Sequence, residues 1–164
     1  EFHFIGTGYI LNDPTSYNIK PIAEEYGLWE KNVFEYPQRI PYLDVLVHLE
    51  NATAVFVLGS TEPHYTPSKV YQGILAEKPI LAVLHKDSTA ADVIIQSNAG
   101  IVLTFNGMEG LNQIHEDFSE KMMAFKNLLK SFKAEQINTT LFNQYSAHAV
   151  TQKLASLLKE AVNK

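Results

Sequence analysis

Two short, continuously apolar runs constrain the fold of this chain more than any other feature of its sequence. They span residues 54–58 and 80–84, and each has the length of a β-strand. A strand that is apolar at nearly every position is typically buried on both faces, as in parallel sheets covered by helices. The sequence therefore predicts an α/β protein whose sheet is covered on both sides.

Strand and helix patterns alternate along most of the chain. Predicted strands span residues 2–5, 32–36, 53–58, 79–84 and 100–105. Apolar residues at helical spacing predict helices over residues 17–26, 42–50, 68–77 and 89–97. Because the connections are short, the alternation predicts one Rossmann-like parallel sheet of about five or six strands, with helices on both faces.

The last part of the chain carries helical patterns alone. Large apolar residues recur every three or four positions from residue 111 to 132 and again from 142 to 161. We therefore expect C-terminal helices within residues 108–164 that pack on the sheet. No linker or repeat separates the patterns, so residues 1–164 are predicted to form a single domain. The first residues already have a strand pattern, and we expect the chain to be a piece of a longer, two-domain protein.

Composition narrows the classes of function. The 164 residues are 46% apolar and 19% charged, which is typical of a globular protein. There is no cysteine, which excludes disulfides, zinc–thiolate sites and a cysteine nucleophile. The net charge is −5, from 13 basic and 18 acidic residues, and this argues against nucleic acid as a partner. No run approaches the roughly 20 apolar residues of a membrane span.

Ligands of parallel α/β sheets bind at the carboxyl ends of the strands, so the segments that follow the strands are the candidate sites. Residues 59–69 are the segment richest in reactive side chains, among them Glu62, His64, Tyr65 and Lys69. The segment leads into a helix with Thr66 as its predicted N-cap and Pro67 at the first helical position. A helix start attracts anions, yet Ser68 is followed there by the cation Lys69, which opposes the helix dipole. This mismatch favours a bound phosphate over an ordinary capped loop.

Two other segments follow strands and are less specific. Gly6, Thr7 and Gly8 allow a backbone to approach a ligand closely because glycine has no Cβ, but a tight turn explains them equally well. The third glycine of the dinucleotide fingerprint is missing. Arg39 and Ile40 lie between two prolines in a loop that could read the edge of a base, or could simply lead into a helix. No set of residues has metal-ligand spacing, so we expect no metal.

Residues 67–82, PSKVYQGILAEKPILA, carry a resemblance to a known family. They are similar to the P-S-K-hydrophobic-x-E-hydrophobic-x-x-x-G-K-P-hydrophobic segment of retaining nucleotide-sugar glycosyltransferases of the GT-B fold, group 1 or family 4 type. Supporting similarities lie at residues 4–8, 33–40, 49–60 and 98–102, so the resemblance covers roughly residues 2–105. It implies that the chain is one half of a GT-B fold, namely the C-terminal, donor-binding domain.

The resemblance implies a function for the longer protein and roles for several residues. The enzyme would move a sugar from a nucleotide-diphosphate donor to a glycan or lipid-linked acceptor with retention, as in polysaccharide biosynthesis. The candidate donor-binding residues are Gly6, Thr7, Gly8, Arg39, Ile40, Tyr65, Thr66, Ser68, Lys69 and Gln72. Gln72 stands where the family has its ribose-binding glutamate, and its amide can bond a diol without charge. The family's earlier carboxylate falls on His64 by strict spacing, with Glu62 two positions away, so these two are the catalytic candidates.

The resemblance also implies partners. They are a nucleotide-sugar and an N-terminal acceptor domain of the same polypeptide, with no obligatory cofactor and no nucleic acid. We expect the isolated chain to be inactive. The expected location is the cytoplasm or the inner face of the membrane, with any peripheral membrane contact made by the acceptor domain. A sugar-nucleotide epimerase shares this fold. A free-standing α/β nucleotide-binding module is another alternative, and Gln72 and His64 keep open a degenerate domain that retains the fold without the activity.

Overall fold

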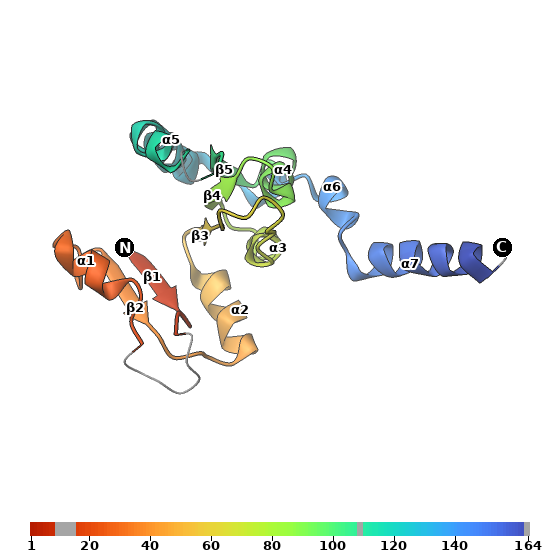
Figure 1. The fold of residues 1–164 in the computed structure, drawn as a ribbon, viewed down its shortest axis with the longest axis horizontal. Coiled ribbons are helices and arrows are strands. Elements are labelled where there is room, and N and C mark those ends of the chain that lie inside the picture. Colours follow the sequence, from red (N-terminus) through yellow and green to blue (C-terminus); the bar gives the residue numbers. More distant parts are fainter. Residues whose placement is uncertain (9–15, 108–109, 163–164) are drawn as a thin grey trace. The chain divides into compact units, whose positions relative to one another are not determined.

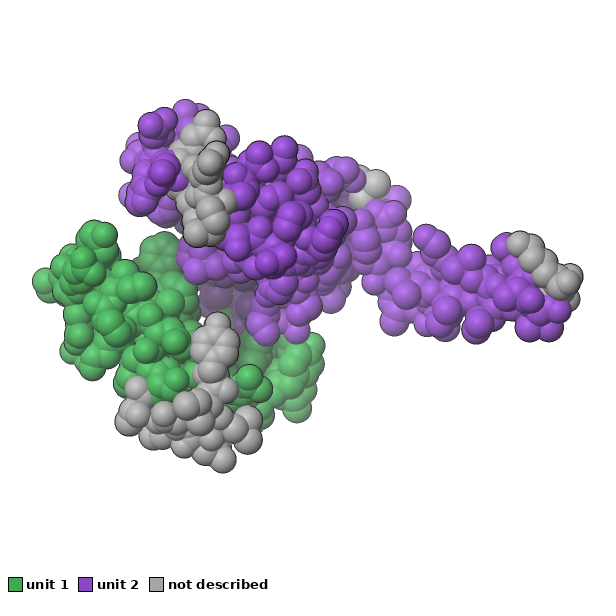
Figure 2. Space-filling view, viewed as in Figure 1, with its two compact units in different colours: residues 1–48 green, residues 49–164 purple. Residues whose placement is uncertain are grey.

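The structure is a computed structural model that describes residues 1–8, 16–107 and 110–162 (Figure 1). The chain divides into two compact units, Glu1–His48 and Leu49–Lys164 (Figure 2). The architecture is α/β with parallel strands, which confirms the predicted class and agrees with a Rossmann-like arrangement in general. The predicted single sheet is wrong for the described strands, which form a two-stranded sheet, β1-β2, and a three-stranded sheet, β3-β4-β5. Alternating patterns locate strands, but they do not determine which strands pair.

The first unit contains a small parallel sheet. Strands β1 (Phe2–Ile5) and β2 (Val33–Tyr36) pair with His3 opposite Phe34. Helix α1 (Lys20–Glu25) is shorter than the predicted helix over 17–26, because the chain just before it bonds to a side chain of β2. Helix α2 (Tyr42–Asn51) follows β2, and none of its residues is buried.

The second unit contains the three-stranded sheet. Its strands are β3 (Val55–Leu58), β4 (Ile80–His85) and β5 (Gly100–Phe105), with β4 in the centre. All residues of β4 are buried except Val83, which is half-buried. This confirms the two-sided burial predicted for residues 80–84. The same prediction is wrong at the end of β3, where Leu58 is 51% exposed.

Helices cover both faces of the three-stranded sheet, as predicted. On one face, α3 (Lys69–Leu75) and α4 (Thr89–Gln96) pack against Ile80, Ala82 and Leu84 of β4. On the other face, Leu81 packs with Phe125 of the long helix α5 (Leu111–Ser131). The side chains of β4 alternate between these two apolar clusters, which is the two-residue period of a strand. Residues 59–69, which follow β3, therefore start from a strand of a sheet that is packed on both faces.

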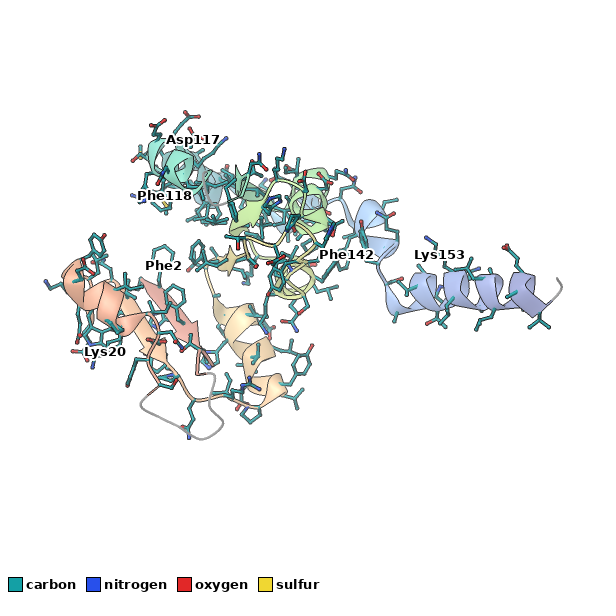
Figure 3. The ribbon with its side chains drawn as sticks, in the orientation of Figure 1. Phe2, Lys20, Asp117, Phe118, Phe142 and Lys153 are labelled. Carbon is teal, nitrogen blue, oxygen red and sulfur yellow. The ribbon has the colours of Figure 1, made fainter. Side chains whose placement is uncertain are left out.

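The C-terminal part forms more elements than the two helices predicted. After α5 come a 3₁₀ turn, η1 (Ala134–Gln136), and the helices α6 (Thr139–Asn143) and α7 (Ala147–Val162). The predicted run over 142–161 is divided because Ser146 begins a new helix, its hydroxyl accepting a hydrogen bond from the Ala149 amide. Phe142 of α6 joins the core, whereas α7, which carries Lys153, has no buried residue among those described (Figure 3). Within the described ranges, no helix is long and apolar enough to cross a membrane.

Candidate functional site

The polar segment 59–69 joins the carboxyl end of β3 to α3. The chain leaves the sheet at Gly59, where a Cβ would lie 2.9 Å from Leu84 Cδ2 and 3.1 Å from the Val83 carbonyl oxygen, so a side chain would be crowded. Two hydrogen bonds then turn the segment back on itself. The Glu62 amide donates to Ser60 Oγ at 3.2 Å, and the Tyr65 amide donates to the Glu62 carbonyl at 3.1 Å. The segment therefore has a defined local conformation.

The start of α3 differs from the sequence prediction. The helix begins at Lys69 and Ser68 is its N-cap, so the predicted N-cap Thr66 and first helical residue Pro67 are wrong. The Thr66 hydroxyl instead forms a hydrogen bond with the Thr89 hydroxyl, at 2.8 Å. Pro67 is buried just before the helix. The Ser68 side chain makes no capping hydrogen bond; the amides of Val70 and Tyr71 donate instead to the carbonyls of Pro67 and Ser68, at 3.1 and 3.2 Å.

Lys69 and Gln72 lie three residues apart on α3, a spacing that places both on one helix face. Lys69 is exposed and Gln72 is partly buried. Gln72 Oε1 is itself buried and has no hydrogen-bond partner among the described residues. An unsatisfied buried acceptor costs about 1–3 kcal/mol, so a donor that reached this amide after a change of rotamer would stabilise it.

The remaining candidates of the second unit are accessible. Glu62, His64 and Tyr65 are all exposed, with Tyr65 at 47%. The structure thus brings the predicted site residues from Glu62 to Gln72 together on one segment and one helix. Their roles toward a ligand stay predictions.

In the first unit, the segments after β1 and β2 lie against each other. The Gly6 amide donates to the Tyr36 carbonyl at 2.8 Å, and the Gly8 amide donates to the Pro37 carbonyl at 3.0 Å. A Cβ on Gly8 would lie 2.9 Å from that Pro37 oxygen, and Gly6 has a φ of 74°. Contact with the chain's own backbone therefore accounts for Gly8, and the positive φ accounts for Gly6. The contact also brings Gly6 close to Arg39, whose Cα would lie 3.8 Å from a Cβ at Gly6. Residues 9–15 lie outside the described residues.

Glu35 is a buried carboxylate that the sequence analysis did not single out. It is 4% exposed and accepts hydrogen bonds from the Thr7 hydroxyl and from the amides of Asn18, Ile19 and Lys20, the three amides at 2.8–2.9 Å. The Thr7 hydroxyl, a predicted ligand contact, is thereby engaged within the protein. The carboxylate fills the start of α1, where an external anion would otherwise bind. The sequence signal was an acid inside the otherwise apolar strand VFEY.

The hydrogen bonds to Glu35 outweigh the effect of its burial. Burial alone would raise the pKa of this carboxyl, but the bonds from Thr7, Asn18, Lys20 and Ile19 stabilise the charged form and lower the pKa below its ordinary value. The group is therefore ionised at neutral pH. It acts as a fixed charge of the fold and is not available as a proton donor.

The comparisons with known proteins do not assign the chain to a family. A scan against protein-family models, a search of curated proteins and a search of solved structures each found no match for the chain. In the part of the chain that the structure describes, no group of three His, Asp or Glu side chains could hold a metal ion.

Proposed function

We propose that the chain is the nucleotide-sugar-binding, C-terminal domain of a retaining glycosyltransferase with the GT-B fold. The observation that carries this proposal is the position of Lys69. It is an exposed cation at the first residue of α3, directly after the polar segment that follows β3. The carboxyl edge of a parallel sheet is where such folds bind ligands, and the P-S-K sequence at this point resembles the donor-binding segment of the family.

The electrostatics at the start of α3 support an anionic ligand. A lysine here is opposed by the positive end of the helix dipole. None of the ion pairs recorded among the described residues involves Lys69. A nucleoside diphosphate supplies the negative charge that would pair with Lys69.

The proposed chemistry is departure of the diphosphate from the donor sugar. Lys69 and the Ser68 hydroxyl hold the diphosphate and stabilise the negative charge that develops on it. The Gln72 amide bonds a ribose hydroxyl, which would satisfy its unpartnered oxygen. Glu62 and His64, both exposed on the preceding segment, are the proposed catalytic side chains.

Replacing Lys69 with alanine is expected to weaken the binding of UDP, GDP or ADP, whichever binds best, by about tenfold or more. A charge-assisted hydrogen bond is worth about 1.5–3 kcal/mol, and 1.4 kcal/mol corresponds to a tenfold change in affinity. Isothermal titration of the 164-residue chain measures the change. Lys69→Arg should retain most of the affinity because it keeps the charge.

Lys78→Ala is the matched control, because Lys78 follows the other end of α3. Binding should also weaken as salt rises in the wild-type protein and less so in Lys69→Ala. Equal loss of affinity in the Lys69 and Lys78 variants would contradict the assignment of Lys69 to the diphosphate.

A further inference from the structure

Two hydroxyl groups of the next strand–helix connection hold the 59–69 segment. Ser88 Oγ donates to the Tyr65 carbonyl at 3.0 Å, and the Thr89 hydroxyl lies 2.8 Å from the Thr66 hydroxyl. Both bonds join residues 23 positions apart in the sequence. They attach two consecutive residues of the segment, Tyr65 and Thr66, to the start of α4. These two residues come three positions before Ser68 and Lys69.

Ser88 departs from the usual behaviour of a serine at its position. It is the N-cap of α4, with extended backbone angles, and it is 1% exposed. A serine there ordinarily accepts a hydrogen bond from an amide of the first turn, which stabilises a helix by about 1 kcal/mol. The Ser88 side chain makes no capping bond and donates to Tyr65 instead. Departures from local rules of this kind are expected at functional or strained sites.

The connection that carries these hydroxyls is itself well fixed. The Ser88 amide donates to the His85 carbonyl at 3.0 Å, and the Asp87 amide donates to His85 Nδ1 at 3.2 Å. His85 is 3% exposed, and its ring meets the edge of Phe105 with centroids 5.7 Å apart. The hydroxyls therefore extend from a hydrogen-bonded turn at the end of the central strand, in which His85 and Ser88 are buried.

We infer that Ser88 and Thr89 are positioning residues for the nucleotide-sugar site. They touch no ligand themselves. They fix Tyr65 and Thr66, and through the buried Pro67 they set where Ser68 and Lys69 present their hydroxyl and ammonium groups. This inference rests on the proposed function, because it concerns the same site.

The test compares removal of each hydroxyl with its retention. Thr89→Val keeps the shape of the side chain and removes the hydroxyl, whereas Thr89→Ser keeps the hydroxyl. Thr89 is exposed, so both variants should fold. Ser88→Ala removes the other bond. The 164-residue chain and each variant are titrated with UDP, GDP and ADP while backbone amide shifts are followed, so that binding is read from folded protein only.

The expected result is binding about five- to tenfold weaker in Ser88→Ala and Thr89→Val, with wild-type affinity in Thr89→Ser. The Tyr65 amide should also exchange hydrogen faster in Ser88→Ala without ligand. Unchanged affinity in both hydroxyl-free variants, beside a wild type that binds, would overturn the positioning role alone. A wild type that binds none of the three nucleotides would overturn the proposed function, and the positioning role with it.

Discussion

Replacing Gly100 with alanine is expected to destabilise the three-stranded sheet by about 3 kcal/mol, the upper range for forcing extra atoms into a packed interior. Gly100 is the first residue of β5 and pairs with Ile80 of β4. A Cβ at this position would lie 1.9 Å from the Ile80 carbonyl oxygen and 2.7 Å from its carbonyl carbon. These are backbone atoms, which no change of rotamer can move away. The strands must therefore separate where their pairing begins.

Hydrogen exchange of the β4 and β5 amides measures this loss within the second unit. Gly107→Ala is the control in the same unit, because no atom recorded for the described residues lies within 4 Å of a Cβ there and the positive φ of 61° is the strain. It should cost about 1–2 kcal/mol. If Gly100→Ala is no more destabilising than Gly107→Ala, that result would contradict the close contact between Gly100 and the Ile80 backbone.

Replacing Glu35 with glutamine is expected to destabilise the first unit by about 2 kcal/mol, the range for hydrogen bonds to a charged group. From the described residues the carboxylate accepts four hydrogen bonds, three of them from backbone amides around the start of α1. The amide of glutamine has one acceptor oxygen and places an NH₂ group among these donors. The sole tryptophan, Trp29, lies in this unit, so its fluorescence during denaturation reports the change.

The pH dependence follows from the lowered pKa of Glu35. A carboxyl whose folded pKa lies below its unfolded value stabilises the fold above the unfolded pKa, about 4.3, and loses this contribution as the pH falls through the folded pKa. The stability difference between wild type and Glu35→Gln should therefore shrink as the pH falls below about 4.3. Glu25→Gln, an exposed acid on α1, should show almost no difference at any pH. A difference that stays constant under acid would contradict the assigned charge of Glu35.

The elements of the central sheet were predictable because their signals are local. Residues 100–105 form β5 as predicted, since a glycine and a run of apolar residues mark its bounds. The buried strand β4 was equally plain from its continuous apolar run. The segment after β3 could be singled out because it gathers polar side chains at a strand end. The concentration of polar and ionisable side chains in residues 59–69 can be recognised without any knowledge of the fold.

The features that the sequence did not predict depend on partners far along the chain. Thr66 looks like an N-cap, but a hydroxyl 23 residues later engages it. Glu35 is an acid inside an otherwise apolar strand, and its partner Thr7 lies 28 residues earlier. The grouping of strands into two sheets also depends on residues far apart in the sequence, because strand pairing is decided by contacts that no local pattern encodes. Helices and strands can be predicted from one sequence more readily than the contacts between residues far apart in that sequence.

The central claim is that this chain binds a nucleotide-diphosphate sugar, and backbone amide shifts of the 164-residue chain test it most directly. The chain is titrated with UDP, GDP, ADP and their sugar conjugates. The account predicts saturable shifts at residues 62–72 and a preference for one base. Absence of shifts at residues 62–72 at millimolar concentrations of every nucleotide would contradict it.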